Sequence, residues 1–166
     1  MKWLLVLLVI AAVYWMVRPH LGGSSSRADM PYRAVPSVLT SAERHFAEAL
    51  ERAVGDRFRL LAKVRLADLV DITTSGQEWW RAFGRISQKH VDFVLVDPAS
   101  WAPRLVIELD DASHRRRDRR ERDELVAGVC KAAGLALLRA PVRRSWDVKE
   151  LAEAVDAQLQ AAPVAS

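Results

Sequence analysis

Cysteine is almost absent from this chain, because Cys130 is the only one among 166 residues. A single thiol cannot form an internal disulfide, so nothing in the sequence indicates an oxidising compartment. We expect Cys130 to be a small buried hydrophobic residue on a helix. The chain also lacks internal repeats, a helix-turn-helix and a zinc motif, which excludes repeat folds and the common modules that read bases.

Most of the chain also lacks a clear excess of basic over acidic residues. The net charge is +4, but four basic residues and one acidic residue in the first 33 positions account for +3 of it. The global charge therefore does not establish nucleic-acid binding, which must rest on local patches. With 28% charged and 51% hydrophobic residues, the composition favours a folded domain.

Trp3–Val17 is the one long apolar run, and it contains no charged residue. As a helix it would rise about 22 Å, less than the hydrocarbon core of about 30 Å. Tyr14 and Trp15 near its end, with the tryptophan at its start, are typical of the aromatic belts at membrane interfaces. Lys2 and Arg18 can snorkel outward and extend its effective length. The run therefore predicts an N-terminal transmembrane anchor.

A cleaved signal peptide is the alternative for this run, because the run is short and follows a lysine. No Ala-x-Ala site comes after it, and the stretch 22–26 (GGSSS) is typical of a flexible linker. Arg18, Arg27 and Arg33 follow the run, whereas Lys2 alone precedes it. The positive-inside rule then predicts a single-pass protein of the inner (cytoplasmic) membrane whose C-terminal domain faces the cytoplasm.

Four segments are expected along the chain: an anchor over 1–18, a linker over 19–36, a folded domain over 37–160 and a disordered tail over 161–166. The domain opens with a helix in which Thr40 is the N-cap and Glu43 completes a capping box. Further apolar patterns predict strands over 58–64, 90–96, 105–109 and 135–139, helices over 78–87, 113–133 and 148–159, and a short helical piece over 66–72. This order implies an α/β domain with a mixed sheet flanked by helices.

Two of these strands carry acids that a buried strand should not contain. Asp92 lies in the first, and Glu108 and Asp110 lie at the end of the second. Alternate residues of a strand share a face. In the second strand, Glu108 and Asp110 are therefore expected on one face, with Ile107 and Leu109 on the other. In the first strand, Val91 and Phe93 are expected on the face opposite Asp92. If the strands form a hairpin, the three acids meet, and their repulsion predicts a site for Mg²⁺ or Mn²⁺. The alternative is that they are exposed at strand ends and paired with arginines.

His114 and a run of arginines follow the second acidic strand. His114 is a candidate general base, or else a cap or surface residue. Cations at a helix N-terminus are unfavourable for the helix dipole, so their clustering suggests contact with a phosphate backbone. A solvated face with i,i+4 ion pairs is the alternative. The candidate nucleic-acid-binding residues here are Arg115, Arg116, Arg119 and Arg122.

Five segments together carry a family resemblance: LTSAERHFAEAL, KHVDFVLVD, LVIELDDASH, RDELVAGVCKAAG and LALLR. In order and spacing they resemble the family called domain of unknown function 2726. More distantly they are similar to the very-short-patch-repair-like branch of the PD-(D/E)XK nuclease superfamily. The resemblance implies a restriction-endonuclease-like fold.

The resemblance also implies roles for particular residues. Asp92 matches the central metal-binding aspartate, Glu108 the first acid of the (D/E)XK element, and Glu43 an acid of the first helix that completes the site. Asp110 stands where many relatives have the lysine, and this departure leaves His114 as the candidate for handling the water. Arg122 and Asp123 match the next helix motif. Arg139 ends the following strand, as in relatives, and is a fifth candidate nucleic-acid-binding residue.

The sequence therefore predicts a membrane-anchored endonuclease with Mg²⁺-dependent phosphodiester hydrolysis of DNA and no small-molecule cofactor. The alternatives are a non-catalytic module that tethers nucleic acid or a protein partner to the membrane, and a purely structural membrane protein. Trp79, Trp80 and Trp101 are expected to pack in the core rather than stack on bases.

Overall fold

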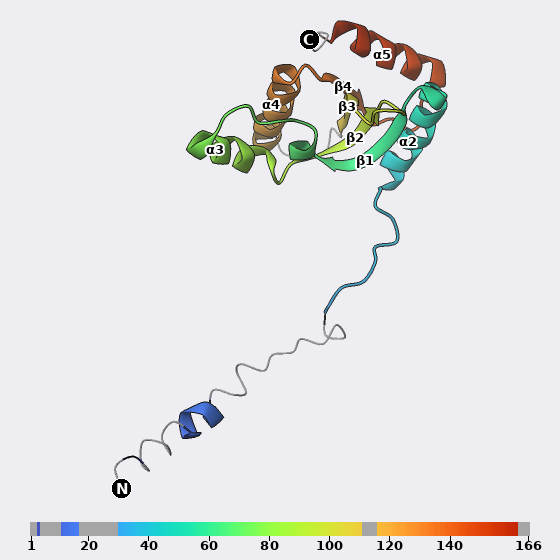
Figure 1. Ribbon diagram of the computed structural model, residues 1–166. Helices are drawn as coiled ribbons and strands as arrows, with labels where there is room; N and C mark the ends of the chain where they lie inside the picture. The colour runs from blue at the N-terminus through green and yellow to red at the C-terminus, as the bar shows by residue number, and fades with distance from the viewer. Residues whose placement is uncertain (1–2, 4–10, 17–29, 111–115, 163–166) are drawn as a thin grey trace. The chain divides into compact units, whose positions relative to one another are not determined.

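A computed structural model describes residues 3, 11–16, 30–110 and 116–162 (Figure 1). The chain divides into two compact units, Met1–Pro36 and Ser37–Ser166. In the first unit, residues 11–16 are helical. Among the described residues, no helix is long and apolar enough to cross a membrane. The transmembrane helix thus has no support from the structure and stays a prediction.

The second unit is built on a four-stranded sheet in the order β1-β2-β3-β4. The strands are β1 (Arg59–Arg65), β2 (His90–Val96), β3 (Pro103–Asp110) and β4 (Ala136–Pro141). β2 pairs antiparallel with both β1 and β3, and β4 pairs parallel with β3. The predicted mixed sheet is confirmed, and each strand lies within about two residues of its predicted position.

Helices cover both faces of this sheet, as predicted (Figure 1). The first core lies between the sheet and the helices α2 and α5, and the second lies between the sheet and the helices α3 and α4. Cys130 is buried in the second core, as expected. The helices are α2 (Ser41–Val54), α3 (Gly76–Ile86), α4 (Arg116–Ala132) and α5 (Val148–Ala161), with 3-10 turns η2 (Gly55–Arg57) and η3 (Leu66–Asp68).

The start of α2 is fixed by the predicted capping box. The Glu43 backbone N–H donates to Thr40 Oγ1 at 3.3 Å, and the Thr40 N–H donates to Glu43 Oε2 at 2.8 Å. These two bonds satisfy backbone donors that a helix start otherwise leaves without partners. They also hold the Glu43 carboxylate at the N-terminal end of α2.

The β2–β3 hairpin brings the predicted acids together. Phe93 pairs with Ile107 in the antiparallel register, so Asp92 lies opposite Glu108. Ile107 is buried in the first core and Leu109 packs against it, as predicted.

Two predictions from sequence are wrong. Val91 lies in the second core and Phe93 in the first, so they do not share the face opposite Asp92, and simple alternation fails there. Trp80 and Trp101 are 68% and 55% exposed rather than in the core. Trp80 lies in α3, and Trp101 lies in the β2–β3 turn with the Arg59 guanidinium 5.0 Å from the centroid of its ring.

Candidate functional site

A cavity of about 200 Å³ lies where β2 begins and β3 ends, between the start of α2 and the helix α4. Four predicted acids line it, and each of the elements α2, β2 and β3 contributes at least one. The lining residues are Glu43, Asp92, Glu108, Leu109, Asp110, Arg122 and Asp123. We call this cavity the acidic pocket.

Asp92 is held through both of its carboxylate oxygens. Oδ2 accepts a hydrogen bond from the Leu109 backbone N–H at 3.0 Å. Oδ1 accepts one from Lys63 Nζ at 3.0 Å. Asp92, on β2, thus forms hydrogen bonds with both neighbouring strands, β1 and β3. These two bonds fix the orientation of its carboxylate.

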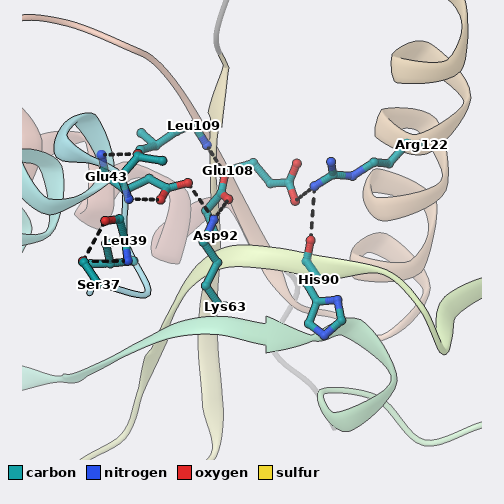
Figure 2. Close-up of polar contacts among 10 residues, drawn as sticks. Ser37, Leu39, Glu43, Lys63, His90, Asp92, Glu108, Leu109 and Arg122 are labelled. Carbon is teal, nitrogen blue, oxygen red and sulfur yellow. Dashed lines mark hydrogen bonds and ion pairs between the residues drawn. The ribbon is translucent and has the colours of Figure 1, made fainter. Parts of the chain in front are cut away.

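Lys63 bridges two acids of the pocket, as Figure 2 shows. Its Nζ donates to Glu43 Oε1 at 2.6 Å as well as to Asp92. Burial alone would raise the pKa of Glu43, but the Lys63 ammonium and the Thr40 N–H outweigh it and hold that pKa below its ordinary value. Burial likewise tends to lower the pKa of Lys63, but Glu43 and Asp92 raise it above its ordinary value. The Glu43 carboxylate and the Lys63 ammonium are therefore both charged at neutral pH.

Glu108 has a different environment, because it is buried at 4% exposure. Its Oε1 accepts no hydrogen bond from any described residue, and its nearest cation is Arg122, with Nη2 at 3.5 Å from Oε1. Burial raises the pKa of Glu108, Arg122 and Arg139 oppose this rise, and the charge of Asp92 adds to it, so the pKa lies above its ordinary value. A buried carboxylate oxygen without a donor is costly, and it marks a place where a cation can be accepted.

The two described arginines predicted to bind nucleic acid both make contacts inside the domain. Arg122 Nη2 also donates to the His90 carbonyl at 3.1 Å (Figure 2). Arg139 donates to the Asp123 carbonyl at 2.6 Å and pairs with the Asp123 carboxylate at 3.3 Å. Their guanidinium groups therefore support the acidic pocket from the side of α4 and β4.

For the other predicted site residues, the structure describes Asp110 in full but only part of the segment that leads into α4. Asp110 lines the acidic pocket, and its carbonyl accepts from the Val142 N–H at 3.1 Å. Arg116 and Arg119 lie in the first turns of α4, but their side chains lie outside the described part of the structure, as do His114 and Arg115 entirely.

Lys63 was not among the residues predicted from the sequence. Ala62 pairs with Phe93 and Val64 with Val91, so Lys63 lies directly opposite Asp92. A lysine inside the apolar strand pattern FRLLAKV was the available signal, and pairing that strand with the one containing Asp92 would have revealed the contact.

A second cavity of about 360 Å³ adjoins the acidic pocket and shares Asp92 and Arg122 with it. Its lining is mainly basic and polar, and we call it the basic pocket. The lining residues are Lys63, Gln88, Lys89, His90, Asp92 and Arg122. Side by side, the two pockets offer oxygen ligands for a cation and donors for an anion.

The structure therefore defines an α/β domain with paired acidic and basic pockets at one end of its sheet. Within the described residues, no group of three or more His, Cys, Asp or Glu side chains is arranged to hold a metal ion. The family model described as "Protein of unknown function (DUF2726)" matches residues 35–159, and the chain belongs to this family. No curated protein and no solved structure matches the chain.

Proposed function

We propose that this protein is a membrane-anchored nuclease of the PD-(D/E)XK superfamily that hydrolyses phosphodiester bonds in DNA with Mg²⁺ or Mn²⁺. One observation carries the proposal: Asp92 and Glu108 line the same pocket from adjacent strands, and Glu108 Oε1 is buried without a hydrogen-bond donor among the described residues. A divalent cation held by these carboxylates would compensate both the burial and the repulsion.

The donor set fits such a cation. Mg²⁺ prefers oxygen ligands, keeps several waters and binds through one or two carboxylates, so Asp92 and Glu108 suffice, with Asp110 beside them. When bound, the ion would polarise a phosphate oxygen and lower the pKa of a bound water.

The chain's own residues orient the reactants. The Leu109 N–H and Lys63 hold Asp92, and Arg122 holds Glu108 from the opposite side. In this proposal His114 accepts a proton from the attacking water. Arg115, Arg116 and Arg119 neutralise the phosphates of DNA that approaches the start of α4.

A non-catalytic module that binds nucleic acid or a protein partner at the membrane is the second candidate. The Lys63 ammonium bridges Glu43 and Asp92 and so already neutralises part of the acidic pocket. An acidic site with an internal cation is stable without a metal, and this favours a domain that binds without cutting.

A cleavage assay separates these functions. The full chain in detergent is incubated with single- and double-stranded DNA and RNA and with Mg²⁺ or Mn²⁺. We expect DNA cleavage that chelation abolishes and that Asp92→Asn or Glu108→Gln reduces by about 10²-fold or more. Asp56→Asn, which changes an exposed acid away from the pocket, is the matched control and should cleave normally.

Two outcomes would contradict the nuclease proposal. The first is no cleavage of any substrate by folded protein, together with no Mn²⁺ binding by calorimetry. The second is cleavage that persists unchanged in both pocket variants, because the activity would then come from elsewhere. Salt-sensitive DNA binding without cleavage would favour the non-catalytic module.

A further inference from the structure

The backbone at Lys63 is unusual for a residue inside a strand. Its φ is +55°, in the left-handed region that residues other than glycine rarely adopt. Such conformations persist only where surrounding contacts hold them, and they concentrate at functional sites. The contacts that hold Lys63 are its hydrogen bonds to Glu43 and Asp92.

The side-chain pattern of β1 changes at the same residue. Leu60 packs against the first core and Leu61 against the second, as alternation requires. Val64 also packs against the second core, although alternation would place it with Leu60. Since β2 shows its own break at Asp92, both strands depart from regular alternation at one cross-strand pair. The departure brings Lys63 within hydrogen-bonding distance of both Glu43 and Asp92, and it places Val64 and Val91 against the second core.

Lys63 Nζ also lies at the junction of the two pockets. It contacts two acids that line the acidic pocket, and its side chain lines the basic pocket. An ammonium group has three N–H donors, and the described residues accept from two of them. With its side chain 37% exposed, Lys63 is accessible to a ligand in the basic pocket.

We infer that Lys63 supplies, from strand β1, the cationic group that the acidic strand β3 lacks at Asp110. Resting on the proposed function, the inference gives Lys63 two tasks. Without metal, its ammonium neutralises Glu43 and Asp92. With substrate bound, its third N–H donates to a non-bridging oxygen of the reacting phosphate in the basic pocket.

Lys63 keeps all its protons during this reaction. A bond forms between the water oxygen and phosphorus, and the bond from phosphorus to the leaving ester oxygen breaks. The proton lost by the water passes to a base, and the leaving oxygen takes a proton from solvent. Lys63 stabilises the charge that gathers on the phosphate oxygens in the transition state.

Two substitutions of Lys63 test the inference in the full chain. Lys63→Met removes the charge and keeps the length, and Lys63→Asn introduces a residue that tolerates positive φ, so folding is protected. We expect both variants to remain folded by circular dichroism and to bind Mn²⁺ more tightly by about tenfold, because no ammonium competes. We expect kcat for DNA cleavage to fall about 10²–10³-fold with KM little changed.

Restoring the ammonium provides a readout that a structural role would not give. In a Cys130→Ala background, Lys63→Cys is treated with bromoethylamine, which rebuilds a lysine analogue at this position alone. Recovery of most of the lost kcat supports the inference. Alkylation of the Cys130→Ala chain with Lys63 intact is the control and should leave activity unchanged.

The outcomes distinguish this inference from the proposed function. Cleavage by Lys63→Met or Lys63→Asn within about threefold of the unmodified chain overturns the role of Lys63 and leaves the nuclease in place. Loss of Mn²⁺ binding in both variants also overturns it, because the lysine would then be needed to build the metal site. Absence of cleavage by the unmodified chain overturns the proposed function, and the inference with it.

Discussion

Glu108 is the residue whose burial conflicts most with stability. Its Oε1 accepts no hydrogen bond from a described residue and has one ion pair, with Arg122 at 3.5 Å. A neutral side chain of the same shape should therefore be more stable at this buried position than the charged carboxylate. We expect Glu108→Gln to raise the free energy of unfolding at neutral pH by about 1 kcal/mol while abolishing activity. Thermal unfolding without metal measures this, with Glu124→Gln on the exposed surface as control. A lower melting temperature for Glu108→Gln would contradict the prediction.

The same residue predicts a pH dependence. The pKa of Glu108 is higher in the folded chain than its ordinary value, so the folded state binds more protons between these two values. The stability from this group is fully present below the ordinary pKa and is lost as the pH rises through the folded pKa. Hence we expect the advantage of Glu108→Gln over the unmodified chain to be small at about pH 4 and larger at about pH 7. Denaturation at both pH values measures it, and a pH-independent difference would contradict it.

At the residue scale, the acids of the pocket could be predicted from the sequence, but Lys63, the cation that pairs with them, could not. The carboxylates Asp92 and Glu108 are found from the strand pattern alone, since an acid in an apolar strand is conspicuous. Lys63 lies 29 positions from Asp92, and the contact depends on strand pairing and on a left-handed backbone. No local pattern encodes either of these, so tertiary structure was needed to find it.

At the scale of single elements, the start of α2 connects folding to the site. The Thr40 hydroxyl caps the helix, and Glu43 serves both the cap and Lys63. We expect Thr40→Ala to lower the free energy of unfolding by about 1 kcal/mol. Chemical denaturation measures it, with Ser41→Ala at the exposed next position as control. Equal stability of the two variants would show that the cap is unimportant.

The arginines of α4 and β4 should differ in whether their substitution affects stability or DNA binding. Arg139 is paired with Asp123, so Arg139→Ala should lower the melting temperature. Arg119→Ala at the start of α4 should leave stability unchanged but weaken DNA binding and reduce its slope against log salt by about 1. Fluorescence anisotropy over a salt series measures this, with Arg52→Ala on α2 as control. An unchanged slope in Arg119→Ala would remove this arginine from the DNA-binding surface.

Most elements were predictable because their patterns are local. The predicted strand over 90–96 has the observed bounds, and the capping box correctly placed the first helix of the domain. The helical piece over 66–72 was less accurate, since only Leu66–Asp68 forms a 3-10 turn. The break at Asp92 could not be predicted, because it lies opposite the left-handed backbone of Lys63 on β1, a contact between strands that are distant in sequence.

At the scale of the whole molecule, the fold explains why the pockets lie together. Each core fills one face of the sheet, and the polar residues collect at the end where β2 begins and β3 ends. The parallel strand β4 places Arg139 beside Glu108. The fold class followed from the element order, but the pairing of β1 with β2, which creates the basic pocket, did not.

The N-terminal segment gives a prediction for the whole chain. If residues 1–18 form an anchor, the expressed protein should stay in the membrane fraction after high-salt and alkaline washing, and its intact mass should include Trp3–Val17. A cleaved signal would instead yield a soluble chain that begins within 22–26. Replacing Leu8 with Arg puts a charge in the middle of the run, so it should release the protein from the membrane. Ser25→Arg in the linker is the matched control and should stay bound, because its added charge lies outside the apolar run.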